Sequence, residues 1–411
     1  MLIGSAVNTG DTAFVLMSAA LVALMTPGLA FFYGGLVRRK NFLSIMMQSF
    51  ISMGVVTAIW VIFGYSLAFG HDHGGIIGGL SYLGLHNVGE MPGPWAPHIP
   101  AAAHFVFQEM FAIITPALIT GAFADRVKFK SYLWFLVVWS VLVYIPFVHW
   151  IWGGGFLAKW GVLDFAGGMV VHVSAGFAAL ASVFVVGKRH FMPGERKLPH
   201  NVAFVALGTG LLWFGWFGFN AGSALSANGV AAQAFLNTDI AGSIAMCTWM
   251  FITWGRSGKP SLTGALTGAV AGLACVTPCA GYVPAWAAFI IGILAGSVCY
   301  FAIVLREKLD WDDALDVWGA HGVGGLLGTM LLGVFAYKTV NAAGANGLVA
   351  GNAAFFGKQV AAALITAVYS FGMTFLILKF IGIFGSIRVP DAVEMKGLDS
   401  ELHGEEAYVL D

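Results

Sequence analysis

Eleven long apolar stretches follow one another along the chain, separated by short polar connections. A helix needs about 20 predominantly apolar residues to cross roughly 30 Å of hydrocarbon, and only the eighth stretch is short by this measure. Continuous apolar runs are not typical of membrane β-barrels, whose strands alternate. We therefore predict an all-α membrane protein with eleven transmembrane helices, near residues 12–35, 43–69, 100–122, 131–150, 165–187, 201–222, 232–254, 262–279, 283–304, 314–335 and 353–384.

The basic residues gather in every second connection and in the tail. By this count 17 of the 20 Lys and Arg residues fall on one side, and the other side has only Lys159, Lys338 and Lys358. The positive-inside rule makes the basic side cytoplasmic, which places the N-terminus outside and the C-terminus in the cytoplasm. An odd number of spans also requires opposite termini. The basic side holds Arg38, Arg39, Lys40, Arg126, Lys128, Lys130, Lys188, Arg189, Arg196, Lys197, Arg256, Lys259, Arg306, Lys308, Lys379, Arg388 and Lys396.

Composition narrows the class of protein further. The chain has 411 residues, of which 59% are hydrophobic and 10% charged, whereas soluble domains carry about 25% charged residues. A net charge of +0 gives no indication of a nucleic-acid partner. We expect a multi-pass protein of the cell membrane (the inner membrane in a Gram-negative host), with lipid as its neighbour.

Signatures of enzymes and metal sites are missing from the sequence. It contains no Walker A motif, no G-x-S-x-G elbow and no H-E-x-x-H motif, so we expect neither an enzyme nor a cofactor. Cys275 and Cys279 share one helix face, but no His or carboxylate lies close to them in sequence. We interpret them as small buried thiols and expect no metal site.

Two sequence patterns recur five spans apart. Asp164 precedes His172 by eight residues in the fifth span, and Asp313 precedes His321 by eight residues in the tenth. The pattern G-x-x-x-F-x-x-G occurs at 28–35 and again at 215–222. Because five is odd, repeats of five spans must be inverted in the membrane. We predict a transmembrane domain over 1–384, made of two inverted five-helix repeats (about 12–187 and 201–335) and one C-terminal helix (353–384), followed by a cytoplasmic tail over 385–411.

His172 and His321 lie deep inside their predicted spans. Ionisable residues at such depth are rare and usually face a bundle interior or a cavity. A single buried histidine is often only a satisfied core hydrogen-bonding group, but two at matching repeat positions favour a role in a pore. An imidazole pair can relay protons or bind a small polar solute. Metal binding would usually need a third ligand, and no deep residue is an obvious one.

Aromatic residues gather near the outer ends of several spans. Phe107 and Phe111 are four residues apart and share a helix face, and Trp152 lies just beyond the fourth span. Such aromatics often form only a core or an interfacial belt. Together with a hydroxyl they fit a cation site, because ring faces attract ammonium-type cations. In the sixth span the residues on one face are Trp216, Phe219 and Ser223.

Three acidic residues lie in or beside the predicted spans that form the pore. Asp164 and Asp313 begin their helices on opposite membrane faces, where a carboxylate can accept backbone N–H bonds. Asp164 is the better functional candidate, because it lies on the outer side near the aromatics. Glu109 is about 200° around the helix from Phe111 and should point away from the aromatic face. A buried partner and an outer-vestibule position would both explain it.

The chain resembles the ammonium transporter family (Amt/Mep, distantly Rh) over nearly its whole length. The resemblance rests on the motifs at 27–35 (PGLAFFYGG), 164–172 (DFAGGMVVH), 215–223 (GWFGFNAGS) and 258–261 (GKPS), and on the tail segments RVP, GLD and HGE. It implies an eleven-helix fold, a homotrimer, one pore in each subunit and transport of ammonium or ammonia, with methylammonium as an analogue. It also suggests that the tail docks a PII-type regulator.

The resemblance also implies roles for individual residues. Trp152, Phe111 and Ser223 would recruit ammonium at the outer mouth with Trp216 nearby, and Asp164 would stabilise that site. Phe111 and Phe219 would form a gate. The pore would be lined by His172, His321, Phe32 and Tyr33. The ion would be deprotonated at the mouth and cross as ammonia, with the proton relayed separately. Two alternatives remain, an ammonium sensor of the same fold and a passive channel for NH₃ or CO₂.

Overall fold

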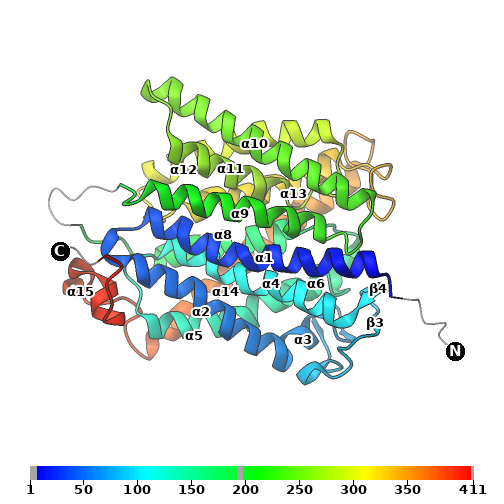
Figure 1. Ribbon diagram of the computed structural model, residues 1–411, viewed down its shortest axis with the longest axis horizontal. Coiled ribbons are helices and arrows are strands. Elements are labelled where there is room, and N and C mark those ends of the chain that lie inside the picture. The colour runs from blue at the N-terminus through cyan, green and yellow to red at the C-terminus, as the bar shows by residue number, and fades with distance from the viewer. Residues whose placement is uncertain (1–6, 192–197, 409–411) are drawn as a thin grey trace.

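Helices run along the long axis of the molecule and connect its two end faces (Figure 1). The structure, a computed structural model, describes residues 7–191 and 198–408, so Arg196 and Lys197 lie outside the described residues. In that described part, ten helices are long and apolar enough to cross a membrane. A shorter apolar helix, Leu262–Val276, occupies the predicted eighth span. The all-helical membrane architecture is therefore confirmed, and the protein is a multi-pass membrane protein.

The helix boundaries follow the predicted spans closely. In several spans a π-helical turn interrupts or precedes the α-helix, at Trp60–Gly64, Ser140–Tyr144, Gly168–Val173 and Trp318–Val323. The α-helices of the spans are α1 (Thr9–Leu36), α2 (Phe42–Ile59), α3 (Tyr65–Phe69), α4 (Ala101–Ile119), α5 (Phe129–Trp139), α6 (Ile145–Ile151), α8 (Ser174–Val186), α9 (Val202–Gly222), α10 (Gly229–Ser257), α11 (Leu262–Val276), α12 (Ala285–Lys308), α13 (Gly324–Phe335) and α14 (Ala353–Ile383).

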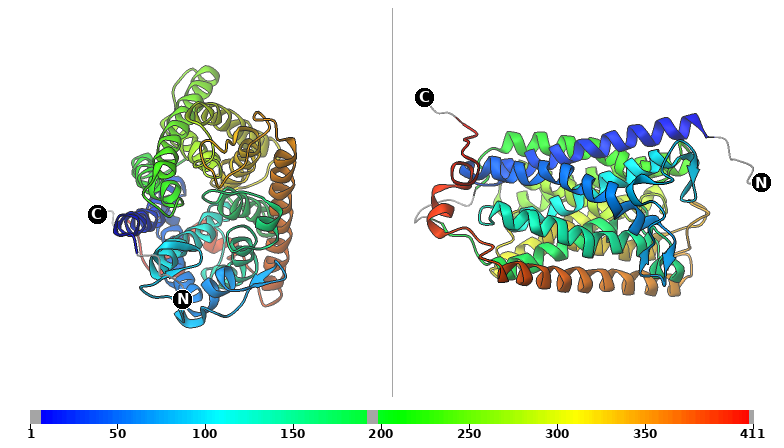
Figure 2. Two further views of the ribbon diagram at one scale, coloured as in Figure 1. Left: turned by 90° about the vertical axis from the view of Figure 1, so that its right-hand side faces the viewer. Right: turned by 90° about the horizontal axis from the view of Figure 1, so that it is seen from below.

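Side-chain caps set several of the helix starts. Asn8 accepts a hydrogen bond from the backbone N–H of Asp11, Asn201 from that of Phe204, and Ser261 from that of Gly264. These Asn and Ser side chains satisfy N–H groups that have no partner inside the first turn. The last long helix, α14, runs along the outside of the bundle (Figure 2) and packs against α5 and α8 as well as α13.

One end of the bundle, here called the strand face, carries short elements that the hydropathy pattern did not predict. Two antiparallel hairpins lie there, β1 (Asp72–His73) with β2 (Ile77–Gly78) and β3 (Pro92–Gly93) with β4 (Ala96–Pro100). The short helix α7 (Phe156–Trp160) lies beside them. The start of α1 is at this end, because the backbone N–H of Asn8 donates to His98 of β4.

The opposite end, here called the basic face, brings together the connections that contain Lys and Arg. The fully buried Arg126 donates hydrogen bonds to the carbonyl oxygens of Ala122, Ala124, Gly187 and Asp312. One guanidinium thus joins three connections that are far apart in sequence. The charge segregation expected from the sequence is present in these described connections.

The two pairs of repeat-related helices run antiparallel where they touch. Gly28 of α1 packs against Leu211 of α9, and Gly218 of α9 packs against Leu21 of α1. Likewise Gly176 lies against Gly322, and Gly325 lies against Gly168. In each pair, higher numbers on one helix meet lower numbers on the other. This is the arrangement that an inverted repeat requires, and glycines allow the close approach.

The C-terminal tail is packed onto the basic face rather than left as a solvated end. Its elements are α15 (Asp391–Lys396) and a π-helical turn (Asp399–His403). The Asp399 carboxylate accepts the backbone N–H groups of Leu43 and Ser44 at the start of α2. Glu394 is fully buried and is paired with Arg388 at 2.6 Å. The tail therefore contributes the N-terminal cap of a membrane helix.

Candidate functional site

His172 and His321 meet at the centre of the bundle. Each lies in a π-helical turn, and their Nδ1 atoms are 3.3 Å apart with the rings nearly parallel. Both side chains are buried. Because one Nδ1 must donate to the other, one Nδ1–H is shared between the rings. The Asp–His spacing that recurs five spans apart therefore marks two histidines that the fold brings into contact.

The space beside the histidine pair is narrow and apolar. A cavity of about 10 Å³ lies there, enough for about one water-sized molecule. The Nε2 atom of His172 is buried and has no hydrogen-bond partner among the described residues. A buried nitrogen of this kind is an open position for one small polar solute. The cavity is lined by Met25, Leu29, Phe32, Ile114, Leu118, Val171, His172, Leu212, Trp216, Phe219, Val270 and His321.

Two phenyl rings in contact, tilted by 30°, separate this middle cavity from a wider one toward the strand face. The ring centroids of Phe111 and Phe219 are 4.1 Å apart, and both side chains are buried. Beyond them lies the strand-face cavity of about 230 Å³. The predicted gate residues are therefore in contact and lie between two cavities. The strand-face cavity is lined by Phe69, Trp95, His104, Gln108, Phe111, Ile151, Trp152, Phe165, Ser223 and Leu225.

The predicted recruiting residues Trp152, Phe111 and Ser223 all line the strand-face cavity. The Trp152 ring stands edge-on to Phe111, with the centroids 5.8 Å apart. Its indole N–H donates to the backbone oxygen of Asp164 at 2.8 Å. The Ser223 hydroxyl donates to the Phe219 carbonyl, which leaves its oxygen lone pairs available to accept a hydrogen bond.

Two predicted site residues stand apart from the strand-face cavity. Trp216 lies deeper, where its indole N–H donates to Thr277 and its ring stacks on His172 at 5.5 Å. The buried Asp164 carboxylate accepts four backbone N–H groups, from Gly167 to Val170. It thus caps the turn that carries His172 and holds Trp152 through its own carbonyl.

Gln108 was not assigned a role from the sequence, although it belongs to the strand-face cavity. It lines this cavity, and its buried Oε1 atom has no hydrogen-bond partner among the described residues. Gln108 is three residues before Phe111, so the two share a helix face. This spacing was the feature of the sequence that could have identified Gln108 as a residue of the cavity. The amide oxygen can accept a hydrogen bond from an ammonium-type cation.

The structure resolves the two alternatives for Glu109 in favour of a buried partner. Glu109 is buried, is absent from the lining of the strand-face cavity in the described part of the chain, and lies beside Thr57 of α2, while its Oε1 atom has no hydrogen-bond partner among the described residues. Its position on the far side of α4 from Phe111 agrees with the helical geometry.

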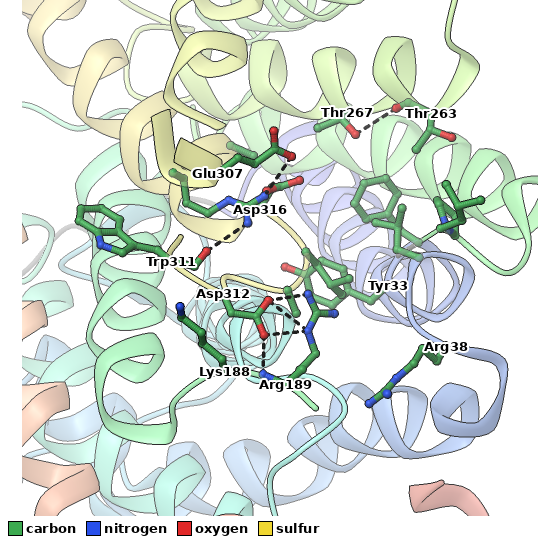
Figure 3. A pocket seen from close by; sticks show the side chains of 18 of the residues that line it. Tyr33, Arg38, Lys188, Arg189, Thr263, Thr267, Glu307, Trp311, Asp312 and Asp316 are labelled. Carbon is green, nitrogen blue, oxygen red and sulfur yellow. Dashed lines mark hydrogen bonds and ion pairs between the residues drawn. The ribbon is translucent and has the colours of Figure 1, made fainter. Parts of the chain in front are cut away.

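Toward the basic face, beyond the histidine pair, lies a cavity of about 470 Å³ (Figure 3). This basic-face cavity reaches His321, and Phe32 and Tyr33 line it as predicted. The Tyr33 hydroxyl donates to the Leu118 carbonyl. The wall also includes several charged side chains, and most of these are paired. The pairs are Lys188 with Asp310, Arg189 with Asp312 and Arg306 with Asp316.

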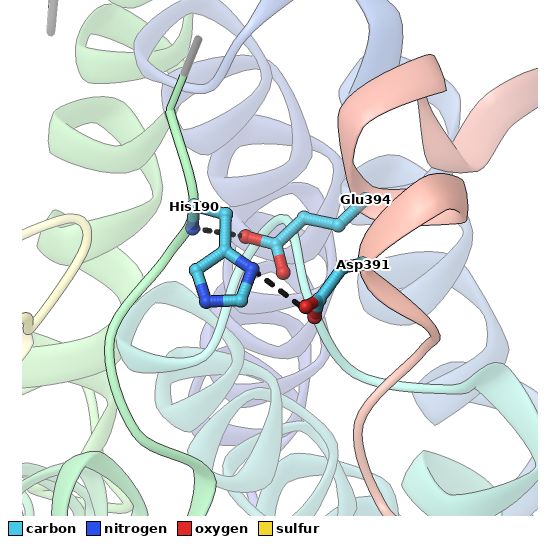
Figure 4. A group of neighbouring side chains, drawn as sticks. All are labelled: His190, Asp391 and Glu394. Atoms are coloured by element: carbon cyan, nitrogen blue, oxygen red, sulfur yellow. Dashed lines mark hydrogen bonds and ion pairs between the residues drawn. The ribbon is translucent and has the colours of Figure 1, made fainter.

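One group of side chains outside the pore could hold a metal ion. The ligand atoms of His190, Asp391 and Glu394 lie within 4.8 Å of one another (Figure 4). However, Arg388 and the backbone N–H of His190 already bind the Glu394 carboxylate. The Arg388 guanidinium already neutralises the Glu394 carboxylate, as a bound metal ion would. We interpret the group as a contact between the tail and the connection that follows α8.

Comparison with known proteins places the chain in one family. Residues 13–408 match the Ammonium Transporter Family. An ammonium transporter of Bacillus subtilis (strain 168) is 48% identical, over 97% of this chain and 98% of that protein. The chain belongs to the Ammonium Transporter Family. This is a family of transporters rather than of enzymes.

Solved structures share the fold of this chain. The crystal structure of Candida albicans Mep2 matches with a TM-score of 0.88 at 36% identity, covering 94% of this chain and 87% of that chain. A structure described as a Sensor Amt Protein matches with a TM-score of 0.87 at 27% identity, covering 96% of this chain and 98% of that chain. A Mep2 structure and one described as a Sensor Amt Protein thus share the fold of this chain.

Proposed function

We propose that the protein transports ammonium. The ion enters the strand-face cavity, loses its proton there, and crosses the middle cavity as ammonia, while the proton passes through His172 and His321. The observation that carries this proposal is the histidine pair beside a cavity of about 10 Å³, closed by the rings of Phe111 and Phe219. Methylammonium would serve as an analogue.

The energetics favour a neutral species in the middle of the pore. A bare ion in so dry and apolar a passage would cost many kcal/mol. A sieve for cations would also discriminate poorly between ammonium and potassium, which are similar in size. Deprotonation at the mouth avoids both problems. The aromatic rings of Trp152 and Phe111 with the oxygens of Ser223 and Gln108 would hold the cation weakly enough to release it.

The shared proton of the histidine pair supports a separate route for charge. A proton arriving on one ring can displace the shared proton toward the other, since the two Nδ1 atoms are in contact. Transport would then carry net charge although the passing molecule is neutral. Asp164 is positioned to stabilise the entrance electrostatically through the helix turn that it caps, without touching the ion.

We propose that the basic face is cytoplasmic and that α11 completes eleven spans. The start of α1 and the tail lie at opposite ends of the bundle (Figure 1), as an odd number of spans requires. The basic connections gather on the tail's side, in agreement with the positive-inside rule. Reaction of single engineered cysteines with an impermeant reagent would test this. Labelling at residue 89 from inside would overturn it.

A homotrimer is the assembly we propose, and one surface feature supports an assembly of copies. Asp239 is exposed within α10 and borders an apolar groove with Phe14, Phe217 and Phe235. A carboxylate facing lipid at such depth is costly, by about 3 kcal/mol on insertion scales. Protein from a neighbouring copy would shield it. Light scattering in detergent should report three chains, and a monomer would contradict the proposal.

The docked tail supports a regulatory partner at the basic face, of the PII type. Because Asp399 caps α2, a protein that binds or displaces the tail would alter that helix start. Removal of residues 390–411 should lower transport or abolish binding of a purified PII protein. Unchanged uptake together with unchanged binding would contradict a regulatory role of the tail.

Current and flux measured together test the function and its two alternatives. Proteoliposomes with the wild type should show ammonium-dependent current and methylammonium uptake. His172→Ala and His321→Ala should each lower the current at least about 100-fold, whereas His86→Gln, an exposed histidine, should not. A passive gas channel would show flux without current and would be indifferent to Trp152 and Ser223. A sensor would bind ammonium with negligible flux.

A further inference from the structure

Asp316 stands out in the basic-face cavity because the proposed mechanism gives it no role. It follows α12, precedes the π-helical turn of His321 and lines the same cavity as that histidine (Figure 3). Its backbone oxygen accepts the N–H of Ala320, so it is attached directly to the start of the histidine turn. Its side chain is 30% exposed.

The backbone of Asp316 is unusual. Its φ angle is +59°, in the left-handed region that side chains rarely adopt. At the corresponding place in the other repeat, three residues after Asp164, stands Gly167 with φ +112°. Both turns therefore need a positive φ at this point. One repeat uses glycine, which takes it without strain, and the other keeps a carboxylate despite the strain.

Only one oxygen of the Asp316 carboxylate accepts a hydrogen bond from the described residues. Its Oδ1 atom accepts a hydrogen bond from Arg306 at 2.5 Å, whereas no described residue donates to Oδ2. The other aspartates of the cavity are held differently. Asp312 is bound through both oxygens by Arg189, and Asp310 is paired with Lys188. Asp316 thus has an oxygen unpaired among the described residues, and it lines the cavity that reaches His321.

We propose that Asp316 is the proton acceptor at the cytoplasmic end of the pore. The N–H bond on the cavity side of His321 breaks, the proton passes through water in the cavity to Oδ2 of Asp316, and it is then released to bulk water. No bond other than N–H and O–H changes. The inference rests on the proposed charge route through the histidine pair.

The charges around Asp316 suit this task. Burial raises the pKa of Asp316 to about 6, although the Arg306 guanidinium opposes this, and the carboxylates of Asp313 and Glu307 add to the increase. A group with such a pKa is ionised at pH 7 and can both take up and release a proton. The charged or titratable groups near it are Arg306 and Glu307 of α12, Arg189 after α8, Asp313 in its own segment and His321.

The test removes the carboxylate without changing the backbone. Asp316→Gly copies the residue found in the other repeat, and Asp316→Asn keeps a side chain that tolerates positive φ. We expect each to lower the ammonium-dependent current at least about tenfold. Asp316→Glu, which keeps a carboxylate, should retain most of the ammonium-dependent current. The matched control is Asp310→Asn, at an exposed acid of the same cavity, which should keep the wild-type current.

A pH profile distinguishes proton transfer from a structural role. With equal pH on both sides, the wild-type current should fall as pH drops through about 6, because protonated Asp316 cannot accept. The residual current of Asp316→Gly should lack this step. Arg306→Gln should move the step to higher pH, because the guanidinium that lowers the pKa of Asp316 is gone.

The outcomes separate this inference from the proposed function. A wild-type current and pH step in either carboxylate-free variant overturns the role of Asp316 and leaves the histidine route standing. An equal loss in Asp310→Asn also overturns it, since general cavity charge would then explain the effect. Methylammonium uptake by the wild type with no current overturns both the charge route and the acceptor.

Discussion

The cavities on the two sides of the histidine pair are built differently, although the same sequence pattern marks both. Toward the strand face, a cavity of about 230 Å³ is walled largely by aromatic rings and is closed off from His172 by Phe111 and Phe219. Toward the basic face, a cavity of about 470 Å³ opens directly onto His321 and is walled by charged pairs. In the proposed mechanism, the first cavity selects a cation, and the second receives the proton and the neutral molecule.

The paired carboxylates show the same contrast. Both oxygens of Asp164 are used by four backbone N–H groups, whereas the equivalent Asp313 accepts one from Trp318 and leaves Oδ1 buried without a partner. Inverted repeats supply similar backbones at both ends. The side chains placed on them then make the ends chemically unequal.

Substitution at Phe111 should have the largest effect and tests whether only the strand-face cavity is closed off from the histidines. Phe111→Ala should join the strand-face cavity to His172 and admit water, so a current without ammonium should appear. Phe32→Ala should add no such current, because the basic-face cavity already reaches His321. Water lowers the cost of an ion in the passage, which is the physical reason for the leak. Equal leaks in both variants would show that the two ends do not differ in closure.

The carboxylate pair should differ in stability. In Asp164→Asn one amide oxygen replaces two acceptors, so N–H groups of the His172 turn lose their partners at a cost of about 2 kcal/mol or more. Asp313→Asn should cost less, because its amide oxygen can still accept the Trp318 N–H. Thermal unfolding followed with a thiol-reactive dye would measure this, since Cys275, Cys279 and Cys299 are buried. A larger loss in Asp313→Asn would contradict the contrast.

Tryptophans at the two ends should differ in their effect on ammonium affinity. Trp152→Leu should raise the KM for methylammonium by between about 2-fold and about 30-fold, the range of a cation–π contact. Trp152→Phe keeps a ring and should lie nearer the wild type. Trp311→Leu, in the basic-face cavity, should leave KM unchanged. A similar KM increase in Trp311→Leu would argue against selection at the strand face.

Ion pairs at the two faces should give the smallest difference. Burial raises the pKa of Asp312. Arg189 and Arg126 lower it by more than burial raises it, so the pKa lies well below its usual value. This stabilisation is present above pH about 4 and is lost as pH falls below it. Arg189→Gln should therefore lower the unfolding temperature at pH 7, with the difference shrinking in acid.

The pair at the strand face serves as the control for this pH dependence. Hydrogen bonds from Lys159 and His149 lower the pKa of Asp72 as well, but exposed pairs contribute little to stability. Lys159→Gln should therefore have no measurable effect on the unfolding temperature at any pH. An effect as large as that of Arg189→Gln would show that the strand face depends equally on its charges.

Local chemistry alone determined the membrane architecture. The hydrophobic runs predicted every long helix to within a few residues, because a span of apolar residues has no other way to satisfy its backbone in lipid. The spacing of Asp164 and His172, repeated at Asp313 and His321, singled out the two histidines that the structure brings into contact. The i,i+4 spacing on α4 and α9 placed Phe111, Phe219 and Ser223 on pore-facing surfaces.

Only the tertiary structure decided what depends on neighbours distant in sequence. The hairpins of the strand face are too short to leave a periodic signal. The open oxygen of Gln108, the burial of Glu109 against α2 and the cap that Asp399 provides for α2 each require segments brought together by folding. The contrast between the two cavities has the same origin. Hydropathy records which residues avoid water, but the size and charge of a cavity depend on which helices pack around it.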